Sequence, residues 1–431
     1  LKPYLDIDQI INLARKKGVD AIHPGYGFLS ENATFARKCK EHGIVWIGPS
    51  PEVMDLLGNK VSAKKIAAKC KVPQIESSRQ KLTTTTVALK EAKRIGYPVM
   101  LKAAAGGGGR GMRIIREAGE LENAFNEAGR ESLNAFGDDT LFLEKYVDDP
   151  KHIEVQILGD HFGNLVHVFE RDCSVQRRFQ KVVEVAPSLG IPQKVKDKLF
   201  DYALKIAGAV SYDNAGTVEF LLDKDHTIYF IEVNPRIQVE HTVTEMVTGV
   251  DLIKAQIFIA GDYKLSDQQI KISSQESIKT TGYALQCRIT TEDPGNDFKP
   301  DYGTIITYRS PGGFGIRLDA GSLYQGAVVS PFFDSMLVKI SAHSRTLDGA
   351  CRKMYRALRE FRVRGVKTNI PYLENIITLY NAFICNGVGE IIRGIIKNSF
   401  YVGSIQINIT YHYHHISCRK VFTLHIYQPY Q

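Results

Sequence analysis

The sequence has no long apolar run and few cysteines. Within its 431 residues no stretch approaches 18 uninterrupted apolar residues, so the sequence predicts no membrane span. The 7 cysteines are scattered without a paired pattern, which predicts a reducing compartment and no disulfide framework. No block of Lys and Arg and no basic stripe with interleaved aromatic residues occurs. We therefore expect no nucleic-acid partner, and the net charge of +8 fits an enzyme that handles anions.

Two further absences concern the ends of the chain. The first residue is Leu1 and not Met, so we expect a fragment whose targeting segment, if any, lies upstream. The last stretch, residues 376–431, is poor in charge, although charged residues make up 24% of the whole chain. Its charged residues are Glu390, Arg393, Lys397, Arg419 and Lys420. The overall composition, 44% hydrophobic, is that of a globular protein and excludes collagen-like, coiled-coil and fully disordered chains.

The hydrophobic pattern predicts an α/β protein of three parts. Residues 1–53 alternate helix and strand, which is typical of a parallel α/β layer whose opening strands precede this chain. A larger unit follows to about residue 260, and a strand-rich unit from about 280 to 370 is closed by a helix at 348–361. The strands predicted in the larger unit lie at 98–102, 141–146, 153–158, 165–171, 216–222 and 228–233.

A glycine run at 106–111 reads GGGGRG and contains GxGxxG. A dinucleotide-binding loop needs a helix after the glycines, but here strand-like segments stand on both sides, and no Gly-Lys-Ser/Thr of a phosphate-binding loop occurs. We predict a hairpin flap whose backbone N–H groups close over phosphates. A disordered surface loop is the alternative. Lys102, in an otherwise apolar strand before the glycines, favours an anion site because an unpaired buried lysine is costly.

Two glutamates mark a hairpin between residues 215 and 234. A two-residue turn at Asp225 and His226 would place Glu219 opposite Glu232. Like charges across a hairpin are destabilising unless a cation lies between them, and Mg²⁺ and Mn²⁺ prefer carboxylate ligands. The alternative is a pair of glutamates on a solvent face.

The chain continues beyond this hairpin with polar residues at every second position. If residues 232–240 are extended, one face carries acids, a cation and amides, and we predict the wall of an active site. Those residues are Glu232, Asn234, Arg236, Gln238 and Glu240. An ordinary half-exposed strand is the alternative. A second polar stretch at 170–181, ERDCSVQRRFQK, fits either a site or a solvated loop.

Together these motifs resemble the biotin carboxylase module of biotin-dependent carboxylases, a family with the ATP-grasp fold. The resemblance rests on HPGYGFLSEN at 23–32, the glycine run, residues 170–181 and residues 232–241. TTEDP at 290–294 and EFRVRGVKTN at 360–369 resemble pyruvate carboxylases more than acyl-CoA carboxylases. The resemblance implies a truncated N-terminal domain (1–53), an ATP-grasp domain (54–262) with a lid (about 75–147), and a C-terminal domain (275–373). A tail outside the family (376–431) would follow.

The resemblance also implies the reaction and its residues. The reaction would be MgATP- or MnATP-dependent carboxylation of biotin by bicarbonate through carboxyphosphate, the first half-reaction of pyruvate carboxylase. Residues implied to bind ATP are Lys60, Lys102, Gly106, Gly107, Gly108, Gly109, Gly111, Glu144, Lys145, Val147, His152 and Gln176. Those implied to hold the metal are Glu219, Glu232 and Asn234, and those implied to hold bicarbonate are Lys181, Arg236, Gln238 and Val239. Glu240 would be the base, Arg236 would stabilise the biotin enolate, and Tyr26 and Arg317 would lie near biotin.

Some expectations follow from what this chain lacks relative to the family. It has no Ala-Met-Lys-Met, so biotin would be a substrate presented by a carrier domain, and the carboxyltransferase domain would also be elsewhere. Phe179 stands where the family has His. The family implies a homo-oligomer in the complete protein, and the mitochondrial matrix or otherwise the cytoplasm as its location. Two alternatives stay open: another ATP-grasp ligase, and an inactive chain that binds nucleotide or partners.

Overall fold

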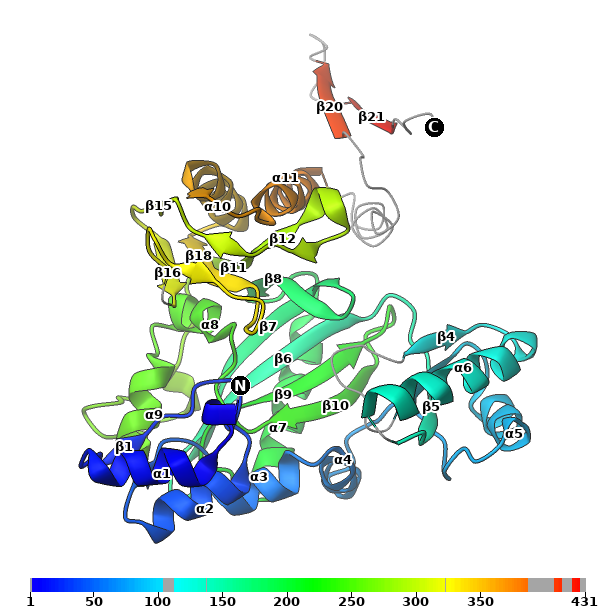
Figure 1. Cartoon of the computed structure of the whole chain (residues 1–431), viewed down its shortest axis with the longest axis horizontal. Coiled ribbons are helices and arrows are strands. Elements are labelled where there is room, and N and C mark those ends of the chain that lie inside the picture. The colour runs from blue at the N-terminus through cyan, green and yellow to red at the C-terminus, as the bar shows by residue number, and fades with distance from the viewer. Residues whose placement is uncertain are drawn as a thin grey trace. The chain divides into compact units, whose positions relative to one another are not determined.

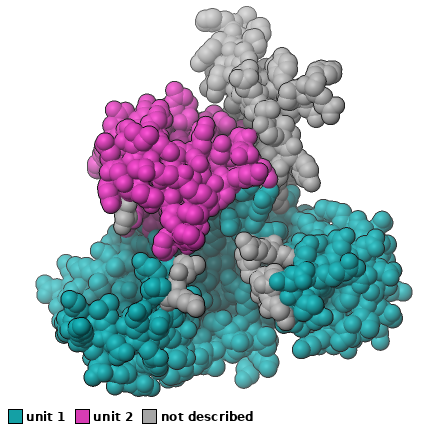
Figure 2. Space-filling model, viewed as in Figure 1, with its two compact units in different colours: residues 1–286 teal, residues 287–431 magenta. Residues whose placement is uncertain are grey.

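The chain folds into two units, residues 1–286 and residues 287–431 (Figure 2). The computed structural model describes residues 2–103, 112–136, 138–321, 323–386, 407–412 and 421–426. No helix within these ranges is both long and apolar enough to cross a membrane.

The first unit begins with the predicted parallel α/β layer. Its strands, β1 (Ala21–Ile22) and β2 (Val45–Trp46), pair in parallel. Asp6 and Asn32 begin the helices by accepting hydrogen bonds from backbone N–H groups of the first turn, as good N-caps do. The elements around the strands are η1 (Lys2–Tyr4), α1 (Ile7–Lys16), α2 (Ala33–Glu41) and α3 (Pro51–Leu57).

The centre of the first unit is an antiparallel sheet with the order β10-β9-β6-β7-β8 (Figure 1). Its strands are β6 (Lys151–Gly159), β7 (Leu165–Arg177), β8 (Gln180–Ala186), β9 (Asn214–Leu222) and β10 (Ile228–Asn234). The polar stretch at 170–181 is therefore not a solvated loop, because it forms the end of β7 and the start of β8.

The two faces of this sheet differ, because successive side chains of each strand point to opposite faces. Ile153, Val155 and Ile157 of β6 face the helices α3, α4 (Lys60–Lys69) and α7 (Gln193–Gly208) in one apolar core. The intervening residues of β6 are polar and point to the other face. On that face α8 (His241–Thr248) and α9 (Leu252–Ala260) follow the hairpin, and α9 packs on a second apolar cluster that includes Leu158. The short helix η2 (Gln275–Ser277) comes last.

A smaller sheet carries the glycine flap. Its order is β4-β3-β5, with β3 (Val99–Ala103), β4 (Arg113–Ile115) and β5 (Leu141–Lys145) all antiparallel to their neighbours. The helices α5 (Thr85–Ile95) and α6 (Ala118–Phe136) share its apolar core. The strands on both sides of the glycine run thus pair, as a hairpin flap requires. Residues 106–111 themselves lie outside the described residues.

The second unit is rich in short strands. Its main strands have the order β11-β18-β16, from β11 (Tyr283–Thr290), β16 (Ile316–Ala320) and β18 (Met336–Ser344). The short pairs are β12 (Glu292–Asp293) with β13 (Lys299–Pro300), β14 (Gly303–Thr304) with β17 (Val328–Val329), and β15 (Thr307–Arg309) with β19 (Arg362–Arg364). A single turn, η3 (Pro294–Asn296), follows β12, and α10 (Leu347–Glu360) is capped by Thr346.

The last helix differs from the expectation for the tail. The boundary predicted at residues 373–376 falls inside α11 (Ile370–Asn386), and Ile376, Ile377 and Leu379 are buried. A segment poor in charge is as compatible with burial as with loss of the family pattern, and three of residues 376–379 are buried in α11. Beyond α11 the structure describes two short antiparallel strands, β20 (Ile407–His412) and β21 (Val421–Ile426).

Candidate functional site

The predicted pair of facing carboxylates is present on the β9–β10 hairpin. Glu219 lies opposite Glu232 in the pairing of the two strands. The Glu219 side chain is buried, and that of Glu232 is half-buried. Carboxylate oxygens on neighbouring strands, with the Asn234 amide beside them, are the ligand types that Mg²⁺ and Mn²⁺ favour.

The register of the hairpin that places the two glutamates opposite each other differs from the register that the sequence analysis predicted. Next to the turn, Phe230 lies opposite Phe220, and a β-bulge then shifts the register so that Ile231 has no partner and Glu232 meets Glu219. The turn is also longer than the predicted two residues. Asp223 holds it, because its Oδ1 accepts hydrogen bonds from the backbone N–H groups of residues 225 and 227 at 2.9 and 2.8 Å.

Lys181 is the centre of a buried ion cluster on the polar face of the sheet. Its Nζ lies 2.8 Å from Glu240 Oε1 and 3.2 Å from Glu219 Oε1, and it also contacts Glu154. Burial opposes the charge on Lys181, but Glu154, Glu240 and Glu219 outweigh burial and raise its pKa well above the usual value. The structure thus brings the predicted bicarbonate lysine and the predicted base together with a metal-ligand candidate.

A second cation, Arg171, lies beneath this cluster and is fully buried. It donates to Glu154 Oε2 from Nε and from one terminal nitrogen at 3.2 Å, and to Gln156, Thr217 and Thr244 at 2.8, 3.1 and 3.0 Å. Burial would raise the pKa of Glu154, but Lys181, His152 and Arg171 hold it well below its usual range. Arg171 therefore fixes Glu154 as an ionised partner for Lys181.

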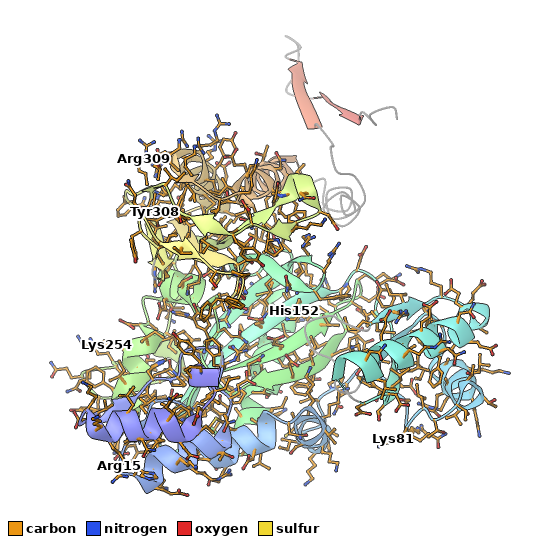
Figure 3. All side chains as sticks on the ribbon, in the orientation of Figure 1. Arg15, Lys81, His152, Lys254, Tyr308 and Arg309 are labelled. Atoms are coloured by element: carbon orange, nitrogen blue, oxygen red, sulfur yellow. The ribbon has the colours of Figure 1, made fainter. Side chains whose placement is uncertain are left out.

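His152 joins the cluster from the start of β6 (Figure 3). Its Nε2 lies 2.8 Å from Glu219 Oε2 and 3.6 Å from Glu154 Oε1. Burial alone would lower its pKa, but the charges of Glu219 and Glu154 outweigh burial and raise the pKa to about 9. The two carboxylates therefore favour the protonated form of His152.

The strip after the hairpin is not the extended wall that we predicted. β10 ends at Asn234, the chain turns at Pro235, and Glu240 begins α8. Proline has no N–H to continue a ladder, which accounts for the end of the strand. The polar side chains nevertheless converge, because Asn234 Nδ2 and Gln238 Nε2 donate to Glu219 Oε1 at 2.8 and 3.3 Å.

Arg236 is held at the edge of this arrangement. Its terminal nitrogens donate to Gln238 Oε1 at 3.0 Å, to the Ile237 carbonyl at 3.2 Å and to Asn234 Oδ1 at 3.1 Å. These bonds fix the plane of the guanidinium. A fixed guanidinium can bind a small anion. Val239, the remaining residue predicted for bicarbonate, is half-buried in the same turn.

The lysines predicted to meet phosphate lie around carboxylates. Lys102 on β3 contacts Glu144 on β5, and Lys64, which the sequence analysis did not select, reaches the other oxygen of Glu144 at 2.6 Å. Burial would raise the pKa of Glu144, but Lys102 and Lys64 outweigh it and lower the pKa. Lys60 lies 3.0 Å from Glu232 Oε2.

The other residues predicted to bind nucleotide have the following places. Lys145 donates from Nζ to the carbonyls of Gly96 and Tyr97 at 2.8 and 3.0 Å, so its side chain anchors the lid. Val147 is half-buried after β5. Gln176 donates from Nε2 to the Cys173 carbonyl at 2.9 Å.

Phe179 lies at the tip of the β7–β8 hairpin. Arg178 and Phe179 both have positive φ, at 48° and 64°, between the paired residues Arg177 and Gln180. Two-residue hairpin turns favour such angles, but bulky side chains adopt them with strain. Phe179 is 55% exposed, so it does not pack on an apolar surface of the described residues.

The two residues predicted to lie near biotin belong to different units. Tyr26 is 36% exposed in the first unit. Arg317, on β16 in the second unit, makes a bidentate pair with Asp319 at 2.9 and 2.8 Å.

The sequence analysis assigned no role to two residues of the ion cluster, Glu154 and Arg171. For Glu154 a signal was available. His152, Glu154 and Gln156 occupy alternate positions of an otherwise apolar strand, which places them on one face. Arg171 lies in the polar stretch at 170–181 that the sequence analysis selected, but it was given no role, because only the pairing of β7 with β6 brings it to Glu154.

Three family models cover most of the chain. They are "Biotin carboxylase, N-terminal domain" at residues 1–54, "Carbamoyl-phosphate synthase L chain, ATP binding domain" at 59–268, and "Biotin carboxylase C-terminal domain" at 286–386. The last model extends to the end of α11, beyond the predicted boundary at residue 373.

Relatives with known structures or curated names agree with these models. The biotin carboxylase–β,γ-ATP complex from Campylobacter jejuni is 45% identical with a TM-score of 0.82, and the match covers 89% of this chain and 84% of that one. The biotin carboxylase domain dimer of the 2-oxoglutarate carboxylase from Hydrogenobacter thermophilus, in complex with MgADP, ADP and bicarbonate, is 47% identical with a TM-score of 0.81, covering 87% of this chain and 81% of that one. The pyruvate carboxylase of Staphylococcus aureus is 55% identical over 374 residues, which are 87% of this chain and 32% of that relative.

These matches establish the class of protein: an ATP-grasp domain placed between the N- and C-terminal domains of a biotin carboxylase. The chain belongs to the biotin carboxylase family. It is similar to the carboxylase part of pyruvate carboxylases and spans about a third of the length of the curated pyruvate carboxylases that it matches, 32% for the one from Staphylococcus aureus.

Proposed function

We propose that the chain catalyses ATP-dependent carboxylation of biotin by bicarbonate, as the first half-reaction of a pyruvate carboxylase. The observation that carries this proposal is the cluster in which Lys181 lies 2.8 Å from Glu240 and 3.2 Å from Glu219, which in turn faces Glu232. It combines a cation for an anionic substrate, a carboxylate base and a pair of carboxylates for a divalent metal.

In the proposed reaction, Glu240 accepts the proton of bicarbonate while Arg236 and Lys181 bind its oxygens. A bicarbonate oxygen then attacks the γ-phosphorus of ATP, the bond to the bridging oxygen breaks, and ADP leaves. The product, carboxyphosphate, decomposes to CO₂ and phosphate; the released phosphate accepts the N–H proton of the biotin ureido group, and that nitrogen attacks the CO₂. Positioning and electrostatic stabilisation by fixed groups account for most of the catalysis in such phosphoryl transfers.

Glu219, Glu232 and Asn234 would hold Mg²⁺ or Mn²⁺, which when bound neutralises charge on the transferred phosphoryl group. The donor set fits a hard cation, since carboxylate and amide oxygens lie on paired strands. Lys60, Lys64 and Lys102 would bind phosphate oxygens, and each already has a carboxylate partner to leave.

The partners of this reaction are also proposals. Biotin would arrive on a carrier domain outside this chain, and pyruvate would accept the carboxyl group in a carboxyltransferase domain, because the chain is similar to one part of curated pyruvate carboxylases. A homodimer is proposed because the Hydrogenobacter domain is named as a dimer.

The test is ATP cleavage by the purified chain with and without bicarbonate and with and without free biotin. We expect cleavage that requires bicarbonate and rises with biotin, and a loss of about 10²- to 10⁴-fold in Glu240→Gln, the range for removal of a general base. An equal rate of ATP cleavage with and without bicarbonate would instead indicate a ligase for another carboxylate. Nucleotide binding without any cleavage would indicate an inactive, binding chain.

A further inference from the structure

The Arg236 guanidinium has one partner that the predicted anion site does not explain. Its Nε donates to Glu31 Oε1 at 2.5 Å. Glu31 lies 205 positions away in the sequence, in the segment between β1 and α2. A guanidinium has five N–H donors, and neutral groups of residues 234–238 occupy three hydrogen bonds of the terminal nitrogens.

These partners of Arg236 differ in charge and in exposure. Gln238, Asn234 and the Ile237 carbonyl are neutral acceptors from the same turn, so they orient the guanidinium without cancelling its charge. Glu31 is a carboxylate with a side chain that is 39% exposed, whereas that of Arg236 is 18% exposed. Glu31 is therefore the partner that neutralises Arg236, and it is also the one that solvent reaches most easily.

The backbone that carries Glu31 is held at both ends. The next residue, Asn32, begins α2 by accepting a hydrogen bond from Phe35 N at 2.9 Å. His23, at the other end of the segment, pairs through Nε2 with Gln256 Oε1 at 3.2 Å. Glu31 can thus leave Arg236 by rotation of its side chain, without movement of the segment.

We propose that Glu31 is a competing counter-ion that lowers the affinity of the anion site: it occupies Nε of Arg236 while the anion site is empty, and bicarbonate displaces it. This inference rests on the proposed function for the identity of the anion. An incoming anion must replace a carboxylate, so anions with few other contacts bind poorly. Bicarbonate offsets the exchange because it can also donate its proton to Glu240 and accept from Lys181, whose Nζ lies 2.8 Å from Glu240 Oε1.

The test measures anion binding without turnover. Line broadening of ¹³C-bicarbonate and of ¹⁵N-nitrate, a planar anion of the same charge, gives both dissociation constants at constant ionic strength. In Glu31→Gln we expect both anions to bind about two- to fivefold more tightly, the range for loss of one partly exposed ion pair. Unchanged or weaker binding would overturn the proposal, since it would make Glu31 irrelevant to the anion or a support for Arg236.

Two further variants locate the effect. Asp55→Asn breaks the exposed Arg37–Asp55 pair of the same unit and should leave both constants unchanged. In an Arg236→Gln background, Glu31→Gln should have no effect on nitrate binding, and a persistent two- to fivefold gain there would show that Glu31 acts elsewhere. Absence of bicarbonate-dependent ATP cleavage would contradict the proposed function alone, because the nitrate measurement needs no catalysis.

Discussion

The lid and the central sheet each bury a carboxylate among cations, but solvent reaches the cations to different degrees. Glu144 of the lid is shared by Lys102 of the lid and Lys64 of α4, and the lysine side chains remain 28% and 30% exposed. In the central sheet Lys181, 15% exposed, is shared by several carboxylates, and Glu154 and Glu240 are completely buried. Lys64 and Lys102 can therefore turn to a phosphate, whereas the central cluster is a fixed network.

The largest expected effect comes from removing the charge of Glu232, which faces Glu219 of the central cluster. We expect Glu232→Gln to lower ATP cleavage by at least about a hundredfold with the fold intact, because even outer-shell partners of metal sites cost 10- to 100-fold. ATP cleavage titrated with Mg²⁺ and with Mn²⁺ measures the effect. Asp225→Asn, an exposed change on the same hairpin, is the control. An unchanged metal dependence in Glu232→Gln would contradict the assignment of Glu232 as a ligand.

A pair of matched variants sharpens the comparison in terms of stability. Glu154→Gln leaves Arg171 buried without its ion pair and should cost about 3–5 kcal/mol of unfolding free energy. Glu144→Gln leaves lysines that solvent can reach, so it should cost less than about 1 kcal/mol. Urea unfolding of both variants measures the difference. Equal losses would show that the two clusters are equally rigid.

The smallest effect concerns a histidine outside both clusters. His161 lies 2.7 Å from Asp262 and 3.5 Å from Asp213, and these carboxylates outweigh its partial burial and raise its pKa to about 9. Because the folded pKa exceeds the usual value near 6.5, its stabilising contribution is complete below pH 6.5 and is lost as pH rises through 9.

His161→Gln should remove this pH dependence. We expect the lost contribution to the unfolding free energy to be less than about 1 kcal/mol, because the pair is partly exposed. The measurement is the difference in unfolding free energy between the chain and the variant at several pH values from 6 to 10. A difference that does not change with pH would show that folding does not shift the pKa of His161.

The sequence predicted the facing glutamates correctly but through two errors that cancel. The turn is longer than two residues, and the bulge at Ile231 restores the pairing of Glu219 with Glu232. Periodicity alone does not reveal a bulge, because an extra residue leaves the apolar pattern on each side intact. The fold class and the three domains were predictable because strand and helix patterns and family motifs agree along residues 1–370.

What could not be predicted from the sequence is mostly the direction in which side chains point. Alternation from Glu232 to Glu240 is equally typical of a strand and of a turn that gathers polar groups, and Pro235 was the signal that the strand ends. Lys145 illustrates the same limit, because its side chain turns to backbone carbonyls of the lid. The assignments of individual site residues to ATP, metal, bicarbonate and biotin stay predictions.

The bulge at Ile231 also bears on how the protein tolerates change in length. The segment next to the turn and the segment with the glutamates pair in separate registers, so the hairpin works as two short ladders joined by an unpaired residue. The turn at 223–227 can then gain residues while the glutamates keep their partners. A reporter peptide or fluorophore inserted there would stand on the same hairpin as the metal-ligand candidates without altering their pairing.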